Sequence, residues 1–188
     1  LLREGILPQK AAMLTLVMGL SVQEAITKHC GAETAIKWPN DILLNRKKLV
    51  GILTEMDCDM EKIHSVTVGM GINVNTKAFP EDLQDIATSL YLETGREYDR
   101  AEIVGCVMKH FEALYEEFLK KGGVFAPFKE RYRRKCLNIG KEVRVIGRET
   151  YLAMALDITP EGELIVKRKD NGAEEVVFSG EVSIREKE

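Results

Sequence analysis

Apolar side chains recur at helical spacing near the start of the chain, between Gln9 and about His29. Few polar residues interrupt the early part of this segment, and Gly31 follows it as a stop signal. The pattern predicts a helix that is buried over much of its circumference. Its apolar positions include Met13, Leu16, Val17 and Leu20.

Short apolar runs follow this helix, and they predict β-strands. A Trp-Pro-Asn-Asp turn separates the first two runs, and the polar stretch Asn45–Lys48 suits a hairpin loop before the third. The fourth run alternates at first and is then interrupted by glycines. The predicted strands are Ala35–Lys37, Ile42–Leu44, Leu49–Met56 and Ser65–Val74.

Helical patterns return in the middle of the chain. We expect a helix over Glu81–Leu92 and a longer one over Asp99–Lys121, which has one apolar face and can be capped by Asp99. A pair of glycines ends the longer helix, and Phe125 to about Lys135 is a third helical piece. Up to this point the predicted fold class is α+β, with helices packed on a sheet.

The pattern changes near residue 138, where short strands alternate with turn signals. Five short strands within about 50 residues are typical of a small closed barrel. We therefore expect two domains, residues 1–137 and residues 138–188. The predicted barrel strands are Glu142–Ile146, Tyr151–Asp157, Leu164–Arg168, Glu175–Phe178 and Val182–Arg185.

Composition excludes several classes of protein. The 188 residues carry a formal net charge of −3, which argues against general nucleic-acid binding. Every apolar run is shorter than the roughly 18 residues of a membrane span, and no secretory signal is visible. The four cysteines and three histidines lack the spacing of a zinc site, so we expect no metal site, reduced thiols and a cytoplasmic location.

Lys37 is the first candidate for chemistry. A lysine at a strand edge usually only protects that edge. Here, however, Pro39 favours an extended Trp38, and the next two residues, Asn40 and Asp41, favour a tight turn that would hold the lysine in place. An ammonium group fixed in a partly dry pocket can stabilise negative charge that develops on a carboxylate or a phosphate. Asp41 would either orient this lysine, act as a base, or cap the turn.

The stretch Val68–Asn75 ("VGMGINVN") contains two glycines in G-x-G spacing, without the full nucleotide-binding fingerprint. In the structural interpretation, Gly69 and Gly71 mark a bulge or bend in a strand. In the functional interpretation, they let a ligand lie against bare backbone, and Asn73 offers an amide that can read an adenine edge. Gly51, in a neighbouring predicted strand, would open the same surface.

A basic cluster, Arg131–Cys136 ("RYRRKC"), lies at the end of the last predicted helix. Most such clusters are solvated faces or interact favourably with the dipole at a helix C-terminus. Binding of a phosphate or of a partner protein stays open as the alternative.

Taken together, "KWPNDILLNRKKLVGILTE", "VGMGINVN", "ATSL" and a small barrel that ends in "SGEVSIRE" resemble bacterial biotin protein ligases. The K-W-P-N-D motif followed by G-I-L-x-E is the most specific part, and the resemblance runs from about Leu2 to Arg185. It implies a catalytic domain similar to class II aminoacyl-tRNA synthetases, followed by an SH3-like barrel. It also implies that a Gly-Arg-Gly-Arg-x-Gly-Arg loop lies upstream of Leu1, so that the chain is N-terminally truncated.

The resemblance implies roles for individual residues. Lys37 matches the family lysine that contacts biotin and the adenylate phosphate. The other matching positions are Gly51, Gly69 and Gly71, whose backbone lines the biotin and adenylate pocket, and Ile72 and Asn73, which lie beside the adenine. The turn that would mount the lysine consists of Trp38, Pro39, Asn40 and Asp41.

The implied activity is an ATP-dependent ligation that passes through biotinyl-5′-adenylate. The substrates would be ATP, with Mg²⁺ on its phosphates, biotin, and a lysine of the biotin carboxyl carrier protein of acetyl-CoA carboxylase or a related carboxylase. A homodimer is common in the family, and we expect no membrane or nucleic-acid partner for this chain. Two alternatives stay open: a lipoate–protein ligase, which shares the acyl-adenylate route, and a non-catalytic interaction or co-repressor module.

Overall fold

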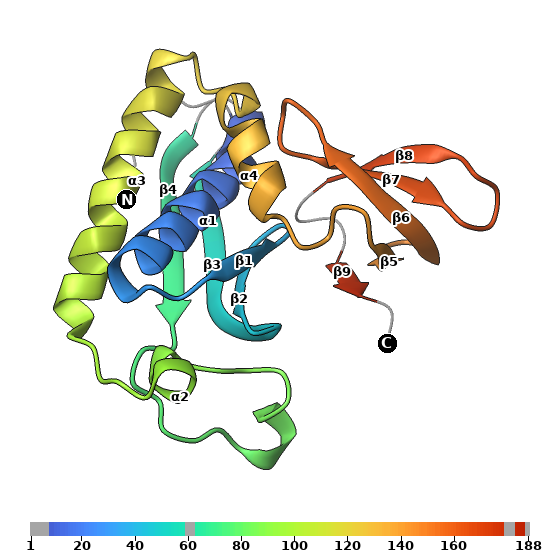
Figure 1. The fold of residues 1–188 in the computed structure, drawn as a ribbon. Helices are drawn as coiled ribbons and strands as arrows, with labels where there is room; N and C mark the ends of the chain where they lie inside the picture. The colour runs from blue at the N-terminus through green and yellow to red at the C-terminus, as the bar shows by residue number, and fades with distance from the viewer. Residues whose placement is uncertain (1–7, 59–62, 179–182, 187–188) are drawn as a thin grey trace.

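Two antiparallel sheets organise the chain (Figure 1). The computed structural model describes residues 8–58, 63–178 and 183–186. The first sheet has four strands in the order β1-β2-β3-β4, and the second has five in the order β8-β7-β6-β5-β9. Helices α1 and α3 lie side by side on one face of the first sheet, and α4 lies near the junction with the second sheet.

The first predicted helix is confirmed as α1 (Pro8–Cys30), which crosses the four-stranded sheet. Its contacts identify the covered face, because Thr15 Oγ1 donates a hydrogen bond to Thr54 Oγ1 at 2.8 Å and Ile52 Cδ1 packs beside Gly19. Many of its apolar side chains are fully buried, as expected for a helix with apolar residues around most of its surface.

The four predicted strands of the first sheet are confirmed as β1 (Thr34–Lys37), β2 (Asp41–Leu44), β3 (Lys47–Cys58) and β4 (Ile63–Ile72). The predicted hairpin loop between β2 and β3 is a two-residue turn, in which Asn45 and Arg46 have φ angles of 48° and 67°. Positive φ at both positions is typical of the primed turns that match the twist of paired strands.

The predicted helix over Glu81–Leu92 is wrong. The structure has only a 3-10 turn, η1 (Glu81–Leu83), and a short helix, α2 (Leu90–Thr94). Ser89 begins α2 as its N-cap, because its side chain accepts the backbone N–H of Leu92 at 3.1 Å.

The competing interaction is with the start of β3, before the point where β3 pairs with β4. The backbone of Lys48 donates to Ile86 O at 2.7 Å and accepts from Thr88 N at 2.9 Å, so this segment pairs with β3. The spacing of apolar residues in this segment predicted a helix. The segment instead forms hydrogen bonds with a strand that is distant in sequence.

The longer helix is confirmed as α3 (Arg100–Lys120), and Asp99 caps it by accepting the backbone N–H of Ala101 at 2.7 Å. The third helical piece consists of a 3-10 turn, η2 (Ala126–Phe128), and α4 (Lys129–Lys135). The apolar face of α3 is buried at Ile103, Val107, Phe111, Leu114 and Phe118.

The second sheet confirms the five predicted strands, in an antiparallel arrangement that is consistent with the SH3-like fold. Val182, where the last predicted strand was expected to begin, lies outside the described residues. The observed strands are β5 (Glu142–Ile146), β6 (Thr150–Ile158), β7 (Leu164–Arg168), β8 (Glu174–Val177) and β9 (Ser183–Glu186).

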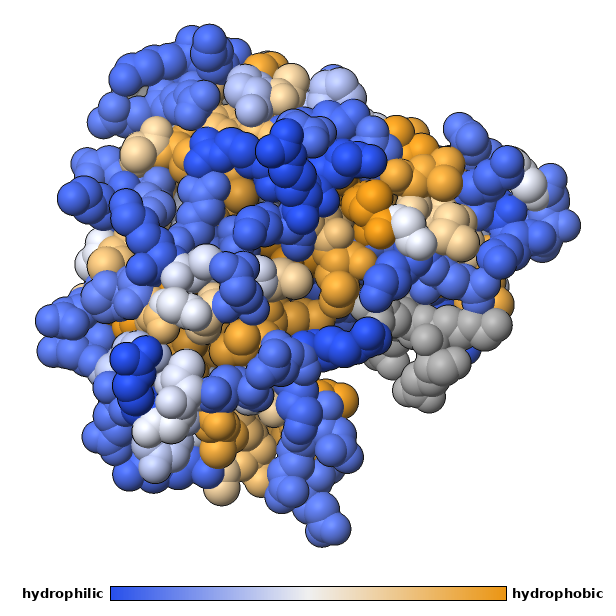
Figure 2. Space-filling view, in the orientation of Figure 1, coloured by the Kyte–Doolittle hydropathy of each residue, from blue (hydrophilic) through white to orange (hydrophobic). Residues whose placement is uncertain are grey.

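Apolar packing continues from the first sheet into the second. One cluster of buried side chains contains residues of α1, the first sheet, α3, α4 and strands β5 to β8. In the orientation of Figure 1, Figure 2 shows apolar residues at the junction between the helices and the second sheet. The predicted division between residues 137 and 138 therefore stays a prediction, although the chain does change from one sheet to the other near this point.

Candidate active site

Four of the predicted site residues lie in one row across the first sheet. Lys37 in β1 is the partner of Asp41 in β2, Asp41 is the partner of Gly51 in β3, and Gly51 is the partner of Gly71 in β4. Neighbouring strands lie about 4.8 Å apart, so this row crosses the whole width of the four strands. Residues separated by up to 34 positions in the sequence are thus brought together by strand pairing.

This row lies on the face of the sheet that α1 leaves uncovered. On β3 and β4 the even-numbered positions face the helices, so the odd-numbered positions, including Gly51, Gly69 and Gly71, face away. Leu53, the partner of Gly69, is 62% exposed on this open face. Within the described residues this face is exposed at Leu53 and half-buried at Lys37, Asp41 and Gly51, and the partly dry pocket expected around Lys37 stays a prediction.

The glycines of β4 are not required by the fold. The β3–β4 register is continuous through Gly69 and Gly71, so the predicted bulge or bend at these positions is wrong. A Cβ at Gly71 would meet no atom within 4 Å, and one at Gly69 would only make an ordinary contact with Leu53 O at 3.7 Å. Because neither glycine has a positive φ, the geometry favours the functional interpretation, a bare backbone surface that a ligand can approach.

Lys48 also belongs to this face, and the sequence analysis missed it. A register shift between Ile42 and Leu43 in β2 lets both Leu49 and Val50 of β3 be buried, with Lys48 on the open side. The side chain of Lys48 lies over Gly51, and its Nζ is 3.2 Å from the position that a Cβ on Gly51 would occupy. The signal was the run of apolar residues at positions 49 and 50, which breaks strand alternation and can indicate a bulge.

The charges on this face are arranged around Asp41. The Asp41 Oδ1 atom is buried and forms an ion pair with Lys48 Nζ at 2.6 Å. Lys37 is half-buried beside Asp41 and makes no ion pair with the carboxylates of the described residues. Next to the bare backbone of the glycine row, the face therefore presents two ammonium groups and one carboxylate, a combination that suits an anionic ligand. Glu55 and Asp57 lie on the same face, further along β3.

The other predicted site residues lie at the borders of this face. Ile72 pairs with Val50 and packs against the buried cluster, so its side chain is on the opposite face from the glycines. Asn73 is fixed through its backbone, which donates to Leu49 O and accepts from Leu90 N, both at 3.0 Å. If Ile72 contacts a nucleotide, it does so through its main chain.

The motif turn is held by its neighbours. Asn40 Nδ2 donates to Ile52 O at 2.9 Å, and the backbone N–H of Ile52 donates to Asn40 O at 2.9 Å. Trp38 is 1% exposed and points toward the second sheet rather than toward the glycines. The Trp38–Pro39 peptide bond is cis.

The basic cluster of α4 is occupied by ion pairs within the molecule. Arg131 binds both carboxylate oxygens of Glu24 at 2.8 Å, and Arg133 binds Asp157 at 3.0 Å. The neighbouring Lys129 also binds Asp157, at 2.9 Å. These pairs connect α4 to α1 and to β6, which favours a structural role over binding of a phosphate or a partner.

Two further features bear on the function. Among the described residues, no three His, Cys, Asp or Glu side chains group in a way that would hold a metal ion. No described helix combines the length and the apolar character that a membrane span needs.

Comparison with known proteins agrees with this geometry. Residues 2–73 match the biotin/lipoate A/B protein ligase family, and residues 139–185 match the biotin protein ligase C-terminal domain. The apo structure of the biotin protein ligase from Aquifex aeolicus superposes with a TM-score of 0.85 at 32% identity, over 96% of this chain and 77% of that one. The chain belongs to the biotin protein ligase family.

Other biotin protein ligases show the same relationship. The Aquifex aeolicus enzyme in complex with biotin and ATP gives a TM-score of 0.83 at 32% identity, over 97% of this chain and 76% of that one. The bifunctional ligase/repressor BirA of Bacillus subtilis is 40% identical over 90% of this chain. The biotin--[acetyl-CoA-carboxylase] ligase of Mycobacterium tuberculosis is 35% identical over 88%. The chain spans 53% and 59% of these two relatives, little more than half of their length.

Proposed function

We propose that this chain is part of an ATP-dependent ligase that converts biotin to biotinyl-5′-adenylate and transfers it to a lysine of a biotin carboxyl carrier protein. The observation that carries the proposal is the row formed by Lys37, Asp41, Gly51 and Gly71 on the uncovered face of the sheet. Bare backbone beside ammonium groups offers a place for a flat ligand that bears a carboxylate or a phosphate. An Aquifex aeolicus relative at 32% identity has been solved with biotin and ATP, which supports the same substrates here.

In the first step, a biotin carboxylate oxygen attacks the α-phosphorus of ATP, and pyrophosphate leaves with the electron pair of the broken P–O bond. Negative charge builds up on the oxygens around this phosphorus in the transition state. Lys37 is the residue we assign to stabilise it, because its neighbours hold it at the end of β1 and no carboxylate of the described residues neutralises it. Lys48, already paired with Asp41, would contribute a second positive charge at a fixed place.

In the second step, the neutral amine of the target lysine attacks the acyl carbon of the mixed anhydride, and AMP is released. Charge now develops on the acyl oxygen, so a cation at the same position helps both steps. Gly51, Gly69 and Gly71 would line the biotin and adenylate site with their backbone, and Ile72 and Asn73 would lie beside the adenine. The turn that holds the lysine in place would consist of Trp38, Pro39, Asn40 and Asp41.

Magnesium is part of the proposal only as the complex of Mg²⁺ with ATP. Mg²⁺ in such sites is held largely by substrate phosphates and water, with one or two carboxylates from the protein. The described residues offer no group of three metal ligands, and the carboxylate of Asp41 is already paired with Lys48. When bound, the ion would neutralise charge on the triphosphate.

Several finer points belong to the same proposal. The carrier would be that of acetyl-CoA carboxylase or a related carboxylase, since relatives are named for that substrate. The free thiols of Cys30, Cys106 and Cys136 support the proposal of a cytoplasmic location. A homodimer and the division into domains 1–137 and 138–188 stay predictions.

Lipoate–protein ligase is the second candidate within the same fold. The family matched by residues 2–73 covers both biotin and lipoate ligases, whereas the match over residues 139–185 is to biotin protein ligases alone. The second match therefore favours biotin. A non-catalytic co-repressor role is the remaining alternative, since some relatives carry the name ligase/repressor.

The test is a labelling assay with the full-length gene product, ATP and an isolated carrier domain. Parallel reactions contain biotin or lipoate, and the carrier is analysed by mass spectrometry. Addition of biotin alone supports the proposal, and addition of lipoate alone supports the second candidate. Isothermal titration with biotin and ATP tests the third alternative, a non-catalytic interaction module, because such a module would give no heat with either ligand.

A further inference from the structure

The segment that leads into the second sheet runs along the outer edge of β1. Leu137 donates its backbone N–H to Ile36 O at 2.7 Å, and Ile36 pairs with Cys136 in a parallel bridge. One residue further on, Asn138 Oδ1 accepts the backbone N–H of Trp38 at 2.8 Å. The side-chain oxygen of Asn138 thereby acts as the next acceptor along this short parallel pair.

These contacts hold the main chain on both sides of Lys37. On one edge of β1, Lys37 is paired with Asp41 of β2. On the other edge, the residues immediately before and after Lys37 are bonded to residues 137 and 138. The position of the Lys37 backbone therefore depends on a segment that is about 100 residues away in sequence and that leads into the second sheet.

The indole ring of Trp38 extends the connection into the second sheet itself. Its Nε1–H donates to Gly162 O at 3.0 Å, in the turn between β6 and β7. Gly162 has a φ of 90°, and a Cβ at this position would collide with Leu16 Cδ1. Only glycine therefore lets this turn come close enough to α1 to present its carbonyl to the indole.

Asn138 contributes through one atom. Its side chain is fully buried, and its Nδ2 has no hydrogen-bond partner among the described residues, whereas Oδ1 holds Trp38. An unpaired buried donor is unfavourable, so this asparagine is not the residue that packing alone would select. The acceptor oxygen is the part of the side chain that the arrangement uses.

We infer that Asn138 is a positioning residue for Lys37, and that through it and Gly162 the second sheet fixes the ammonium group used in adenylate formation. The inference rests on the proposed function, in which Lys37 stabilises charge on the α-phosphate. It assigns a part in the first chemical step to residues that do not touch the ligand.

The test compares Asn138→Leu with Asn138→Asp in the full-length gene product. Leucine is similar in size and removes the acceptor, whereas aspartate keeps an oxygen acceptor in either protonation state. We expect Asn138→Leu to lower the rate of biotinyl-adenylate formation at saturating biotin and ATP by about tenfold or more, because small displacements of a catalytic group are costly. Asn138→Asp should recover most of this loss. Trp38 is the one tryptophan of the chain, so its fluorescence reports directly on the contact.

A double-mutant cycle of Asn138→Leu with Lys37→Met separates positioning of Lys37 from general stabilisation of the fold. If Asn138 acts through Lys37, Asn138→Leu has little further effect on the rate when Lys37 is already replaced. Equal losses in both backgrounds would show that Asn138 supports only the fold, and the inference would be wrong.

Two controls keep the outcome clear. If Asn138→Leu does not fold, as judged by circular dichroism, Trp38→Phe takes its place in the cycle, because it keeps an aromatic ring and loses the indole donor to Gly162. A wild-type protein that forms no biotinyl-adenylate overturns the proposed function and this inference with it. An active wild type with additive losses overturns the inference alone.

Discussion

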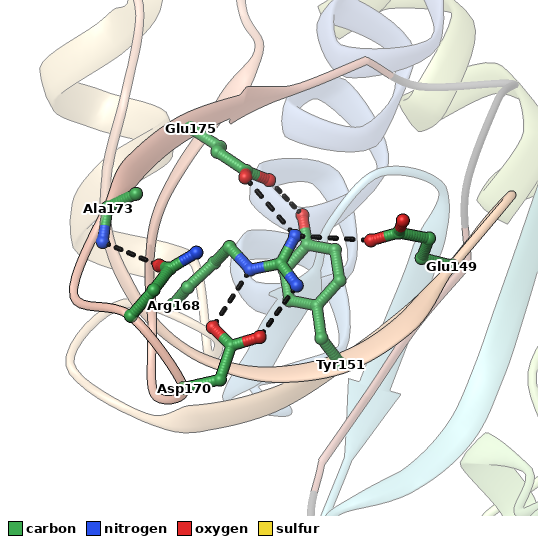
Figure 3. A network of polar contacts seen from close by, with 7 residues as sticks. Glu149, Tyr151, Arg168, Asp170, Ala173 and Glu175 are labelled. Carbon is green, nitrogen blue, oxygen red and sulfur yellow. Dashed lines mark hydrogen bonds and ion pairs between the residues drawn. The ribbon is translucent and has the colours of Figure 1, made fainter.

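Arg168 in the second sheet and Lys37 in the first are both cations on β-strands, and they differ in what surrounds them. The guanidinium of Arg168 lies 4.0 Å above the ring of Tyr151 and binds Asp170 through two hydrogen bonds of 2.7 and 2.9 Å (Figure 3). Glu175 and Glu149 complete the group at 3.3 and 3.5 Å. Burial and the hydrogen bond to Glu175 raise the pKa of Tyr151 to about 12, and its hydroxyl donates that hydrogen bond to Glu175.

The face around Lys37 has the opposite character. Asp41 is paired with Lys48, and Lys37 has no carboxylate partner among the described residues. Three glycines leave the neighbouring backbone bare, where the Arg168 cluster has an aromatic ring. A cation that is surrounded by its own acids holds a structure together, whereas a cation beside empty backbone is available to a ligand. The comparison can be tested by disturbing each region in turn.

The largest effect is expected from Lys37→Ala. Loss of one preorganised cation should slow biotinyl-adenylate formation by about a hundredfold or more, without a change in the temperature of unfolding. Pyrophosphate release measures the rate. Lys109→Ala, an exposed change on α3 behind the sheet, is the matched control. Near-normal turnover of Lys37→Ala would contradict the role of Lys37 in adenylate formation.

Gly71→Val is expected to weaken biotin binding while the fold is retained. A side chain at this position meets no atom within 4 Å and would project into the space assigned to the ligand. Overpacking typically costs about 1–3 kcal/mol, which corresponds to roughly 5–150-fold in affinity. Isothermal titration and a thermal melt check the two parts. Thr67→Val, on the same strand and face but away from the glycine row, should bind biotin normally.

Arg168→Met is expected to give the reverse result, with a lower temperature of unfolding and unchanged adenylate formation. The substitution leaves Asp170, Glu175 and Glu149 facing one another without their shared cation. Lys167→Met, at the exposed neighbouring position, controls for loss of a charge. A loss of activity in Arg168→Met at temperatures where it is fully folded would contradict the assignment of this cluster to structure.

The smallest effect is a pH dependence at Asp157, which joins α4 to β6. Burial raises the pKa of Asp157, but the hydrogen bond from Lys129 and the charges of Lys129 and Arg133 outweigh this, so the pKa lies below its ordinary 3.8. A lowered pKa stabilises the folded state above 3.8, and this contribution is lost as the pH falls through the folded-state value. Thermal melts between neutral and acidic pH should therefore show a steeper loss for wild type than for Asp157→Asn. Asp82→Asn, at an exposed position of η1, should behave as wild type.

Most of the elements could be predicted from the sequence, because their signals are local. The spacing of apolar residues located α1, α3 and the strands of both sheets, and turn residues located the hairpins. The failure over Glu81–Leu92 has a specific cause, since hydrogen bonds between residues 86–88 and Lys48 replaced those of a helix. No local pattern contains that information.

By itself, the sequence determined which residues are the candidates for chemistry, namely Lys37, the turn that follows it, and the glycines, because motif and residue type are local properties. The tertiary structure decided how they meet. Strand register placed Lys37, Asp41, Gly51 and Gly71 in one row, and a bulge added Lys48. It also decided that Trp38 is held by Asn138 and Gly162. Register and long-range hydrogen bonds depend on pairing between distant segments, which the order of residues along one segment does not specify.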